Sequence, residues 1–215
     1  YPMIGTYVAW RASKGKEDRN RRHERYGRAR QPRPAGPLIW VHAAGEGETV
    51  AVTPLVEHFL SLGVHVVLTT HNMSSAQTCR ERLGDRVIHQ YVPLDMKPAV
   101  ARFLDHWQPD LAVFAESEIW PMSILELNAR RIPQVLVSGR MSDRAYTSWR
   151  KRAWFAEALF ENFALVVAQS DTDAERFQSL GARPVAVGGN LRTDIGPLPV
   201  DELELRRIRN EIGER

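Results

Sequence analysis

Short apolar segments alternate with longer amphipathic ones along most of this 215-residue chain. The apolar segments have the length of strands, and seven of them lie at residues 38–41, 64–70, 87–92, 111–115, 134–137, 165–168 and 185–187. Most are unbroken apolar runs, which indicates strands buried on both faces. Strands that alternate with helices build repeated βαβ units. The pattern therefore predicts an α/β fold with a Rossmann-like, doubly wound parallel sheet.

The intervening segments carry helix signals, and the helices are expected at residues 49–62, 74–83, 97–107, 121–131, 143–162, 171–180 and 200–212. Gly63, Gly84 and Gly181 follow three of them, where glycine commonly ends a helix. With 43% hydrophobic residues, the chain can bury the core of one ordinary domain. We expect three parts: a basic, membrane-proximal arm and linker at 1–37, the Rossmann-like domain at 38–196, and a linker helix at 197–215.

A strand, a tight turn and a helix follow one another at residues 38–52, where Gly45 and Gly47 permit the turn and Glu46 and Glu48 sit at its tip. Ligands of open α/β sheets bind beyond the carboxyl ends of the strands. The two acids have two interpretations. They could be solvated acids favoured by the helix dipole, or one could be a general base that takes a proton from a hydroxyl. The missing phosphate-loop glycine pattern argues against a phosphate site.

Polar residues also end three other predicted strands, and they are Thr69, Thr70, His71, Asn72, Ser74, Glu116, Ser117, Glu118, Ser138, Gly139 and Arg140. Since parallel strands end at one edge of the sheet, these residues are expected to gather there. Glu116 and Glu118 could be solvated loop acids or ligand-binding groups. Arg140 could hold a phosphate through a bidentate fork or pair with either acid. His42, inside the first strand, is predicted to be a core histidine.

The positive charge is concentrated near the start of the chain. Residues 11–33 hold ten Lys or Arg against three acids, whereas the whole chain has a net charge of only +3. Such an arm suits anionic lipid headgroups or nucleic acid, and a merely solvated helix is the third interpretation. The aromatic, apolar residues 1–10 precede it, an order typical of the cytoplasmic end of a membrane anchor, so we expect an upstream segment. The lone Cys79 excludes an internal disulfide and favours a reducing compartment.

Four phrases carry a family resemblance: His-Ala-Ala-x-x-Gly-Glu-Thr at 42–49, Glu-Ser-Glu-Ile-Trp-Pro at 116–121, Ser-Gly-Arg-Met-Ser-Asp-Arg at 138–144 and Gly-Asn-Leu-Arg-Thr-Asp at 189–194. In order and spacing they resemble the 3-deoxy-D-manno-octulosonic acid (Kdo) transferases of lipid A biosynthesis. The basic stretch at 14–27 also resembles that family's segment after its N-terminal anchor. The likeness covers nearly the whole chain.

The resemblance implies an inverting GT-B glycosyltransferase that moves Kdo from CMP-Kdo to a lipid A precursor, lipid IVA, in lipopolysaccharide biosynthesis. The family works at the cytoplasmic face of the bacterial inner membrane and uses neither a metal nor another cofactor. Its first domain binds the acceptor and its second binds CMP-Kdo. The chain would then be the acceptor domain, inactive alone, with residues 197–215 leading to an absent donor domain.

The resemblance places the general base on Glu48, although the chain has Gly45 and Glu46 where the family usually has Ser and an apolar residue. The acceptor-binding residues it suggests are Gly47, Thr70, Glu116, Glu118, Arg140 and Ser142. The residues expected to face the membrane are Arg11, Lys14, Lys16, Arg21 and Arg22. The expected partners are the lipid A precursor, an anionic membrane surface and the donor domain. The rival hypothesis is a non-catalytic Rossmann-like module whose basic arm grips nucleic acid.

Overall fold

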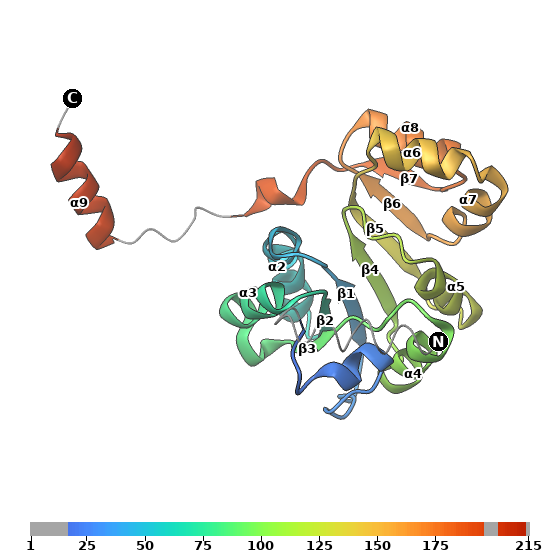
Figure 1. The fold of residues 1–215 in the computed structure, drawn as a ribbon, viewed down its shortest axis with the longest axis horizontal. Helices are drawn as coiled ribbons and strands as arrows, with labels where there is room; N and C mark the ends of the chain where they lie inside the picture. The colour runs from blue at the N-terminus through green and yellow to red at the C-terminus, as the bar shows by residue number, and fades with distance from the viewer. Residues whose placement is uncertain (1–16, 196–201, 214–215) are drawn as a thin grey trace.

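A seven-stranded, entirely parallel sheet forms the centre of the protein (Figure 1). The computed structural model describes residues 17–195 and 202–213. The strands are β1 Leu38–His42, β2 His65–Thr70, β3 Ile88–Tyr91, β4 Leu111–Ala115, β5 Gln134–Gly139, β6 Leu165–Ala168 and β7 Val185–Val187. Their order in the sheet is β3-β2-β1-β4-β5-β6-β7. The predicted Rossmann-like, doubly wound sheet is confirmed, and the strand order reverses between β1 and β4.

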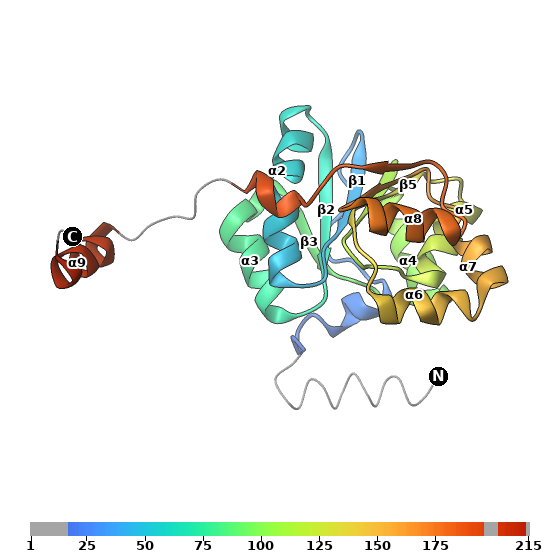
Figure 2. The same cartoon turned by 90° about the horizontal axis from the view of Figure 1, so that it is seen from above.

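The helices cover both faces of this sheet. They are α2 Glu46–Ser61, α3 Met73–Leu83, α4 Lys97–Trp107, α5 Pro121–Ala129, α6 Asp143–Arg150, α7 Ala153–Phe160, α8 Asp171–Ser179 and α9 Glu202–Ile212, with the short 3-10 helices η1 Arg22–Tyr26, η2 Gly84–Arg86 and η3 Leu191–Asp194. Figure 2 shows α2 and α3 on one side of the sheet and α4, α5 and α7 on the other. Two hydrophobic cores follow, one on each face.

Strand β1 is buried along its whole length because it lies in the middle of the sheet. Its side chains alternate between the two cores, with Trp40 in one and Val41 in the other. The Trp40 ring packs against Phe103 and Phe114, with ring centroids 4.7 and 5.3 Å away. This double burial explains the unbroken apolar run in the sequence.

The predicted long helix at 143–162 is interrupted in the structure. Helix α6 ends at Arg150, a turn follows, and α7 begins at Ala153. The turn brings Trp149 back over α7, where its ring stacks on Phe155 with centroids 6.3 Å apart and meets Phe160 edge-on at 5.4 Å. Neither glycine nor proline marks the break in the sequence. We therefore attribute the interruption of the helix to the packing of Trp149 against the aromatic residues of α7.

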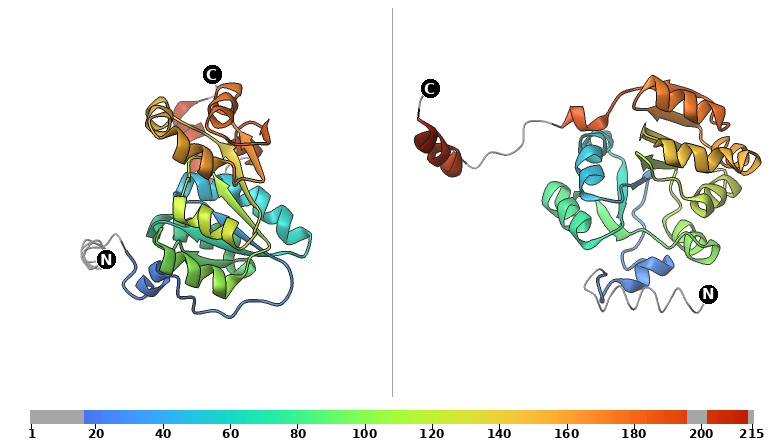
Figure 3. Two further views of the ribbon diagram at one scale, coloured as in Figure 1. Left: turned by 90° about the vertical axis from the view of Figure 1, so that its right-hand side faces the viewer. Right: turned by 45° about the horizontal axis from the view of Figure 1, so that its top comes forward.

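The basic segment is folded onto the sheet from residue 17 onward. Of regular elements, the described part of this segment contains only the short η1, which lies against α4 and β3 (Figure 3, blue). The guanidinium of Arg25 is 3% exposed and forms an ion pair of 2.9 Å with Glu17. The Glu24 carboxylate accepts the backbone N–H of Tyr91 at 2.8 Å. These contacts cover the edge strand β3, which would otherwise present unpaired backbone groups. Arg11, Lys14 and Lys16 lie outside the described residues.

Gly27 makes this docking possible. Its φ is +75°, and a Cβ there would lie 2.0 Å from the carbonyl oxygen of Ala99 in α4. We expect Gly27→Ala to lower the free energy of unfolding by about 2 to 5 kcal/mol. The alanine would have to adopt a left-handed backbone conformation, and its Cβ would also overlap with the backbone of α4. Urea unfolding would measure the loss. Gly36→Ala is the control, since Gly36 has a φ of +96° but nothing within 4 Å of its Cβ position; an equal loss in both variants would contradict the close approach.

Candidate functional site

Three carboxylates gather where β1 and β4 end side by side. Glu48 belongs to the first turn of α2, and Glu116 and Glu118 follow β4 directly. Glu118 contacts His42 at the end of β1, and both Glu116 and Glu118 act electrostatically on Glu48. The sequence prediction that the loops at 45–49 and 116–120 share one edge of the sheet is therefore confirmed.

Glu48 turns back toward the end of β1. Its Oε2 accepts the backbone N–H groups of Ala44, at 2.6 Å, and Gly45, at 3.2 Å, so the carboxylate caps its own helix. This cap explains why α2 begins at Glu46, earlier than the predicted start at 49. The other oxygen, Oε1, makes no hydrogen bond within the part of the chain that the structure describes. Glu46, in contrast, is exposed in the first turn.

The pKa of Glu48 is raised above its ordinary value. Burial is the main cause, and the negative charges of Glu118 and Glu116 add to it, while the two backbone N–H groups oppose the shift. A carboxylate with a raised pKa binds a proton more readily, which suits a general base. Burial and hydrogen bonding thus distinguish Glu48 from its exposed neighbour Glu46.

Glu118 is held by the buried His42 and the half-buried Trp120. Its Oε2 accepts the indole N–H of Trp120 at 2.6 Å and lies 3.3 Å from His42 Nε2. Burial raises the pKa of Glu118, but the hydrogen bonds from His42 and Trp120, together with the electrostatic influence of His42 and His71, outweigh it, so the net pKa is lowered. Glu118 therefore stays ionised beside Glu48.

His42 is fully buried, as the sequence suggested for a core histidine. A carboxylate can only accept, so Nε2 carries the proton toward Glu118. On the other side of the ring, Nδ1 lies 2.9 Å from the hydroxyl of Thr69, which in turn accepts the indole N–H of Trp40 at 2.8 Å. A chain of hydrogen bonds thus runs from the core tryptophan to the site.

Glu116 is bound by an arginine that sequence reasoning did not assign. Arg192 of η3 contacts the single oxygen Oε1 of Glu116 with both Nε, at 3.0 Å, and Nη2, at 2.9 Å. The only sequence signal for Arg192 was its place in the phrase at 189–194. Figure 2 shows η3 beside α2. A Cβ at Gly47 would lie 3.1 Å from Arg192 Nη2, so the glycine leaves room for this guanidinium.

Two residues at these strand ends have left-handed backbones without being glycine. Glu116 has a φ of 54° and Ser138 a φ of 53°. The Ser138 hydroxyl accepts hydrogen bonds from Gln169, at 3.0 Å, and from the backbone N–H of Leu191, at 3.3 Å. Such strain persists only where surrounding contacts enforce it, and it is concentrated at functional sites.

Arg140 and Ser142 lie on the exposed loop after β5. The guanidinium of Arg140 makes no hydrogen bond or ion pair with the described residues, and its backbone N–H donates to the Glu116 carbonyl at 3.1 Å. Arg192, not Arg140, is therefore the partner of Glu116. Ser142 caps α6 by accepting the backbone N–H of Ala145 at 3.3 Å.

The remaining predicted residues are placed differently. Thr70 is fully buried, and its hydroxyl bonds His89 Nε2 at 2.9 Å, so it faces the interior. Arg21 pairs with Glu24 at 2.7 Å, whereas Arg22 is exposed. Over residues 17–195 and 202–213, no group of three acidic, histidine or cysteine side chains could hold a metal ion, and no helix is long and apolar enough to cross a membrane.

The family model and similar known proteins identify the same family. The family model described as 3-deoxy-D-manno-octulosonic-acid transferase (kdotransferase) matches residues 20–195. A 3-deoxy-D-manno-octulosonic acid transferase of Rickettsia bellii is 35% identical over 98% of this chain and 51% of its own length. One from Bordetella pertussis is 35% identical over 84% of this chain and 44% of its own length. The chain thus spans about half the length of these relatives.

Among solved structures, a UDP-GlcNAc 2-epimerase from Neisseria meningitidis, bound to UDP-GlcNAc, superimposes with a TM-score of 0.56 at 14% identity. The match covers 82% of this chain and 52% of that one. At this identity the likeness concerns the fold alone. It agrees with a Rossmann-like half of a two-domain GT-B architecture.

The lowered pKa of Glu118 predicts a pH-dependent loss of stability on substitution. A carboxylate whose pKa is depressed by folding stabilises the protein above its unfolded pKa, and the contribution disappears as the pH falls through the folded value. At neutral pH we expect Glu118→Gln to lower the free energy of unfolding by about 1 to 3 kcal/mol, the scale of hydrogen bonds to a charged group. Urea unfolding between pH 7 and 3 should show the difference from wild type shrinking toward acid. A constant difference would contradict the assignment, and the exposed Glu46→Gln is the control.

Proposed function

The chain belongs to the 3-deoxy-D-manno-octulosonic acid (Kdo) transferase family, and we propose that it is the acceptor-binding half of an enzyme that transfers Kdo from CMP-Kdo to lipid IVA in lipopolysaccharide biosynthesis. The observation that carries the proposal is Glu48, a half-buried carboxylate of raised pKa with one uncommitted oxygen, at the strand edge where ligands of such sheets bind.

Glu48 acts as the general base in a single displacement. Its Oε1 takes the proton of the acceptor hydroxyl while that oxygen bonds to the anomeric carbon of Kdo. The bond between this carbon and the phosphate oxygen of CMP breaks, and CMP leaves with the electron pair. Because attack and departure occur on opposite faces, the anomeric configuration inverts. Ala44 and Gly45 hold Oε2, which fixes the direction of the base.

Arg140 binds a phosphate of the acceptor. Its guanidinium is exposed and uncommitted among the described residues, and the fork of an arginine matches phosphate geometry. Glu116 and Glu118 are committed to Arg192 and to His42 with Trp120, so they shape the electrostatics around Glu48 and offer their remaining lone pairs to acceptor hydroxyls. Gly47, beside Arg192, and Ser142, two residues after Arg140, complete the proposed acceptor surface.

The donor is bound by a second half of the enzyme, to which helix α9 leads. Catalysis by positioning needs the donor and the hydroxyl held together, and orientation can supply roughly 7 to 11 kcal/mol of the barrier. The chain alone is therefore inactive in transfer. No metal or other cofactor takes part.

The enzyme works at the cytoplasmic face of the bacterial inner membrane, where its acceptor lies. The basic segment meets anionic headgroups, which attract each nearby Lys or Arg by about 1 kcal/mol. Arg22 and Arg28 are its exposed arginines in η1 and just after it, and Arg11, Lys14 and Lys16 complete the proposed surface outside the described residues. Arg21 and Arg25 serve the fold instead, through Glu24 and Glu17.

In the full-length enzyme, Glu48→Gln should reduce kcat by about 10²- to 10⁴-fold, because the amide keeps the shape but cannot accept the proton. A transfer assay with CMP-Kdo and lipid IVA measures it, and an unchanged unfolding transition would show an intact fold. Glu46→Gln is the matched control and should retain most activity. The reverse order of the two variants would assign the base to Glu46.

Replacing Arg22 and Arg28 with Gln should weaken binding to vesicles of phosphatidylcholine with phosphatidylglycerol, and the effect should shrink as salt rises. Vesicle co-sedimentation at low and high salt measures it. The charge-matched control is Arg131→Gln with Arg183→Gln, two exposed arginines elsewhere. Equal losses in the two double variants would point to net charge rather than to this surface.

A further inference from the structure

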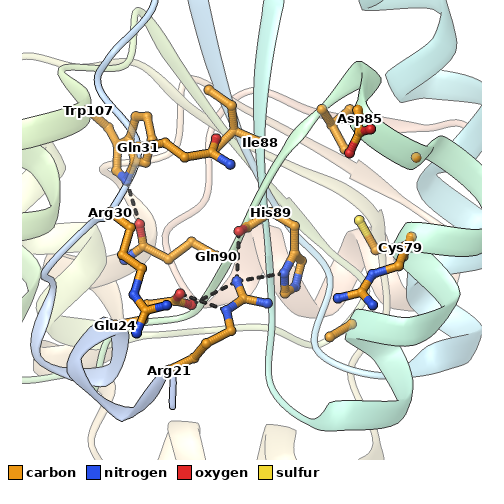
Figure 4. Close-up of a pocket in the computed structure, with 14 residues that line it drawn as sticks. Arg21, Glu24, Arg30, Gln31, Cys79, Asp85, Ile88, His89, Gln90 and Trp107 are labelled. Atoms are coloured by element: carbon orange, nitrogen blue, oxygen red, sulfur yellow. Dashed lines mark hydrogen bonds and ion pairs between the residues drawn. The ribbon is translucent and has the colours of Figure 1, made fainter. Parts of the chain in front are cut away.

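A polar pocket lies beside the edge strand β3. Its volume is about 220 Å³, and residues of α3, β3 and α4 line it together with the basic segment (Figure 4). Three arginines are among the lining residues: Arg21, Arg30 and Arg80. None of Glu48, Glu116 and Glu118 is among its lining residues. The proposed transfer reaction therefore leaves this pocket unexplained.

Gln90 places an unpaired donor at this pocket. Its side chain is 2% exposed, and its Oε1 accepts the indole N–H of Trp107 at 2.8 Å (Figure 4). An indole N–H can only donate, so the amide cannot be turned around and its NH2 group must point away from Trp107. This Nε2 has no hydrogen-bond partner among the described residues. A buried amide without a partner is costly, and an incoming oxygen would satisfy it.

Arg80 supplies a positive charge that is similarly uncommitted. Its side chain is exposed on α3 and makes no hydrogen bond or ion pair with the residues of the described ranges. Arg30 donates to the backbone carbonyl of Asn20 at 2.6 Å and to His23 Nε2 at 3.2 Å, and both are exposed contacts that water could replace. Both side chains can therefore turn toward a ligand.

The carboxylates in the lining do not cancel these charges. Glu24 is held by the guanidinium of Arg21, at 2.7 and 2.9 Å, and by the backbone N–H of Tyr91. Asp85 is exposed on η2. With Glu24 and Arg21 paired, two arginines remain against one solvated acid. The excess of positive charge favours the binding of an anion in this pocket.

His89 adds neither charge nor an available acceptor. Its Nδ1 lies 3.0 Å from Arg21 Nη2, which can only donate, so the ring proton is on Nε2 and is donated to Thr70. Burial, followed by the charges of Arg21, Arg80 and Arg25, lowers the pKa of His89 to about 3. The ring therefore stays neutral, and Gln90 Nε2 and the Arg80 guanidinium are the donors left available to a ligand.

We propose that this pocket binds a phosphate group, with Gln90 Nε2 and the Arg80 guanidinium as its principal donors and Arg30 closing over it. A phosphate group presents several anionic oxygen acceptors, which match the available donors Gln90 Nε2 and Arg80. Because Nε2 is closed to solvent, the exposed Arg30 side chain first moves aside to admit the phosphate and then closes over it. The same chemistry is offered by a soluble phosphate ester and by a phospholipid headgroup.

Inorganic phosphate is the first probe. Calorimetric titration of the whole chain at constant ionic strength, with chloride as the reference anion, should show saturable binding. Arg80→Gln and Gln90→Leu should each weaken it about tenfold or more, as expected for the loss of one hydrogen bond to a charged ligand. Arg82→Gln, on the same helix but outside the lining, should bind like wild type. Arg80 is exposed, so its variant keeps the test valid if Gln90→Leu fails to fold.

Competition identifies the source of the phosphate. Glycerol phosphate displacing inorganic phosphate, without an effect of phosphatidylglycerol vesicles, assigns a soluble ester. Displacement by the vesicles that is lost in Arg80→Gln assigns a headgroup. Phosphate binding no stronger than chloride, or binding unchanged in both pocket variants, would overturn the proposal. The test does not depend on the proposed Kdo transfer, because neither Arg80 nor Gln90 belongs to the site around Glu48.

Discussion

The site depends on three carboxylates packed at the adjoining ends of two central strands. Neighbouring negative charges disfavour the ionised form of each carboxyl group, and the other contacts of each group determine how far that effect is offset. Glu116 has the guanidinium of Arg192, and Glu118 has the donors of His42 and Trp120. Glu48 has only backbone amides to offset its burial and both neighbouring charges. Burial and the two neighbouring charges therefore raise the pKa of Glu48, the acid best placed to accept a proton.

The parallel sheet makes this arrangement possible. Reversal of the strand order between β1 and β4 sets their following loops side by side, and η3 returns from beyond β7 to place Arg192 between Gly47 and Glu116. The left-handed backbones of Glu116 and Ser138 are maintained by hydrogen bonds from neighbouring strands and from η3. The buried chain from Trp40 through Thr69 to His42 ties the same edge to the hydrophobic core. Stability of the core and electrostatics of the site are thus linked.

Features with a local sequence signal could be predicted. Apolar runs and helix-ending glycines located the strands and most helices, and parallel topology placed Glu48 and Glu116 on one edge. Contacts between distant segments could not be predicted. Arg192 is distant from Glu116 in the sequence, whereas Arg140 follows a neighbouring strand, so Arg140 was the candidate for the ion-pair partner of Glu116. The break after Arg150 depends on Trp149 packing against Phe155 and Phe160, and the charge-rich segment before β1 gave no sign that Arg25 would be buried with Glu17.

The coupling between Glu48 and Glu118 is the central claim, and a ¹³C NMR titration of the glutamate side-chain carboxyls tests it most directly. In wild type, the pKa of Glu48 should lie above the ordinary value of 4.5. In Glu118→Gln it should move downward, because a neutral amide replaces the charge that opposes ionisation of Glu48. A Glu48 carboxyl that titrates at or below 4.5 in wild type, or that does not respond to loss of the Glu118 charge, would contradict the account.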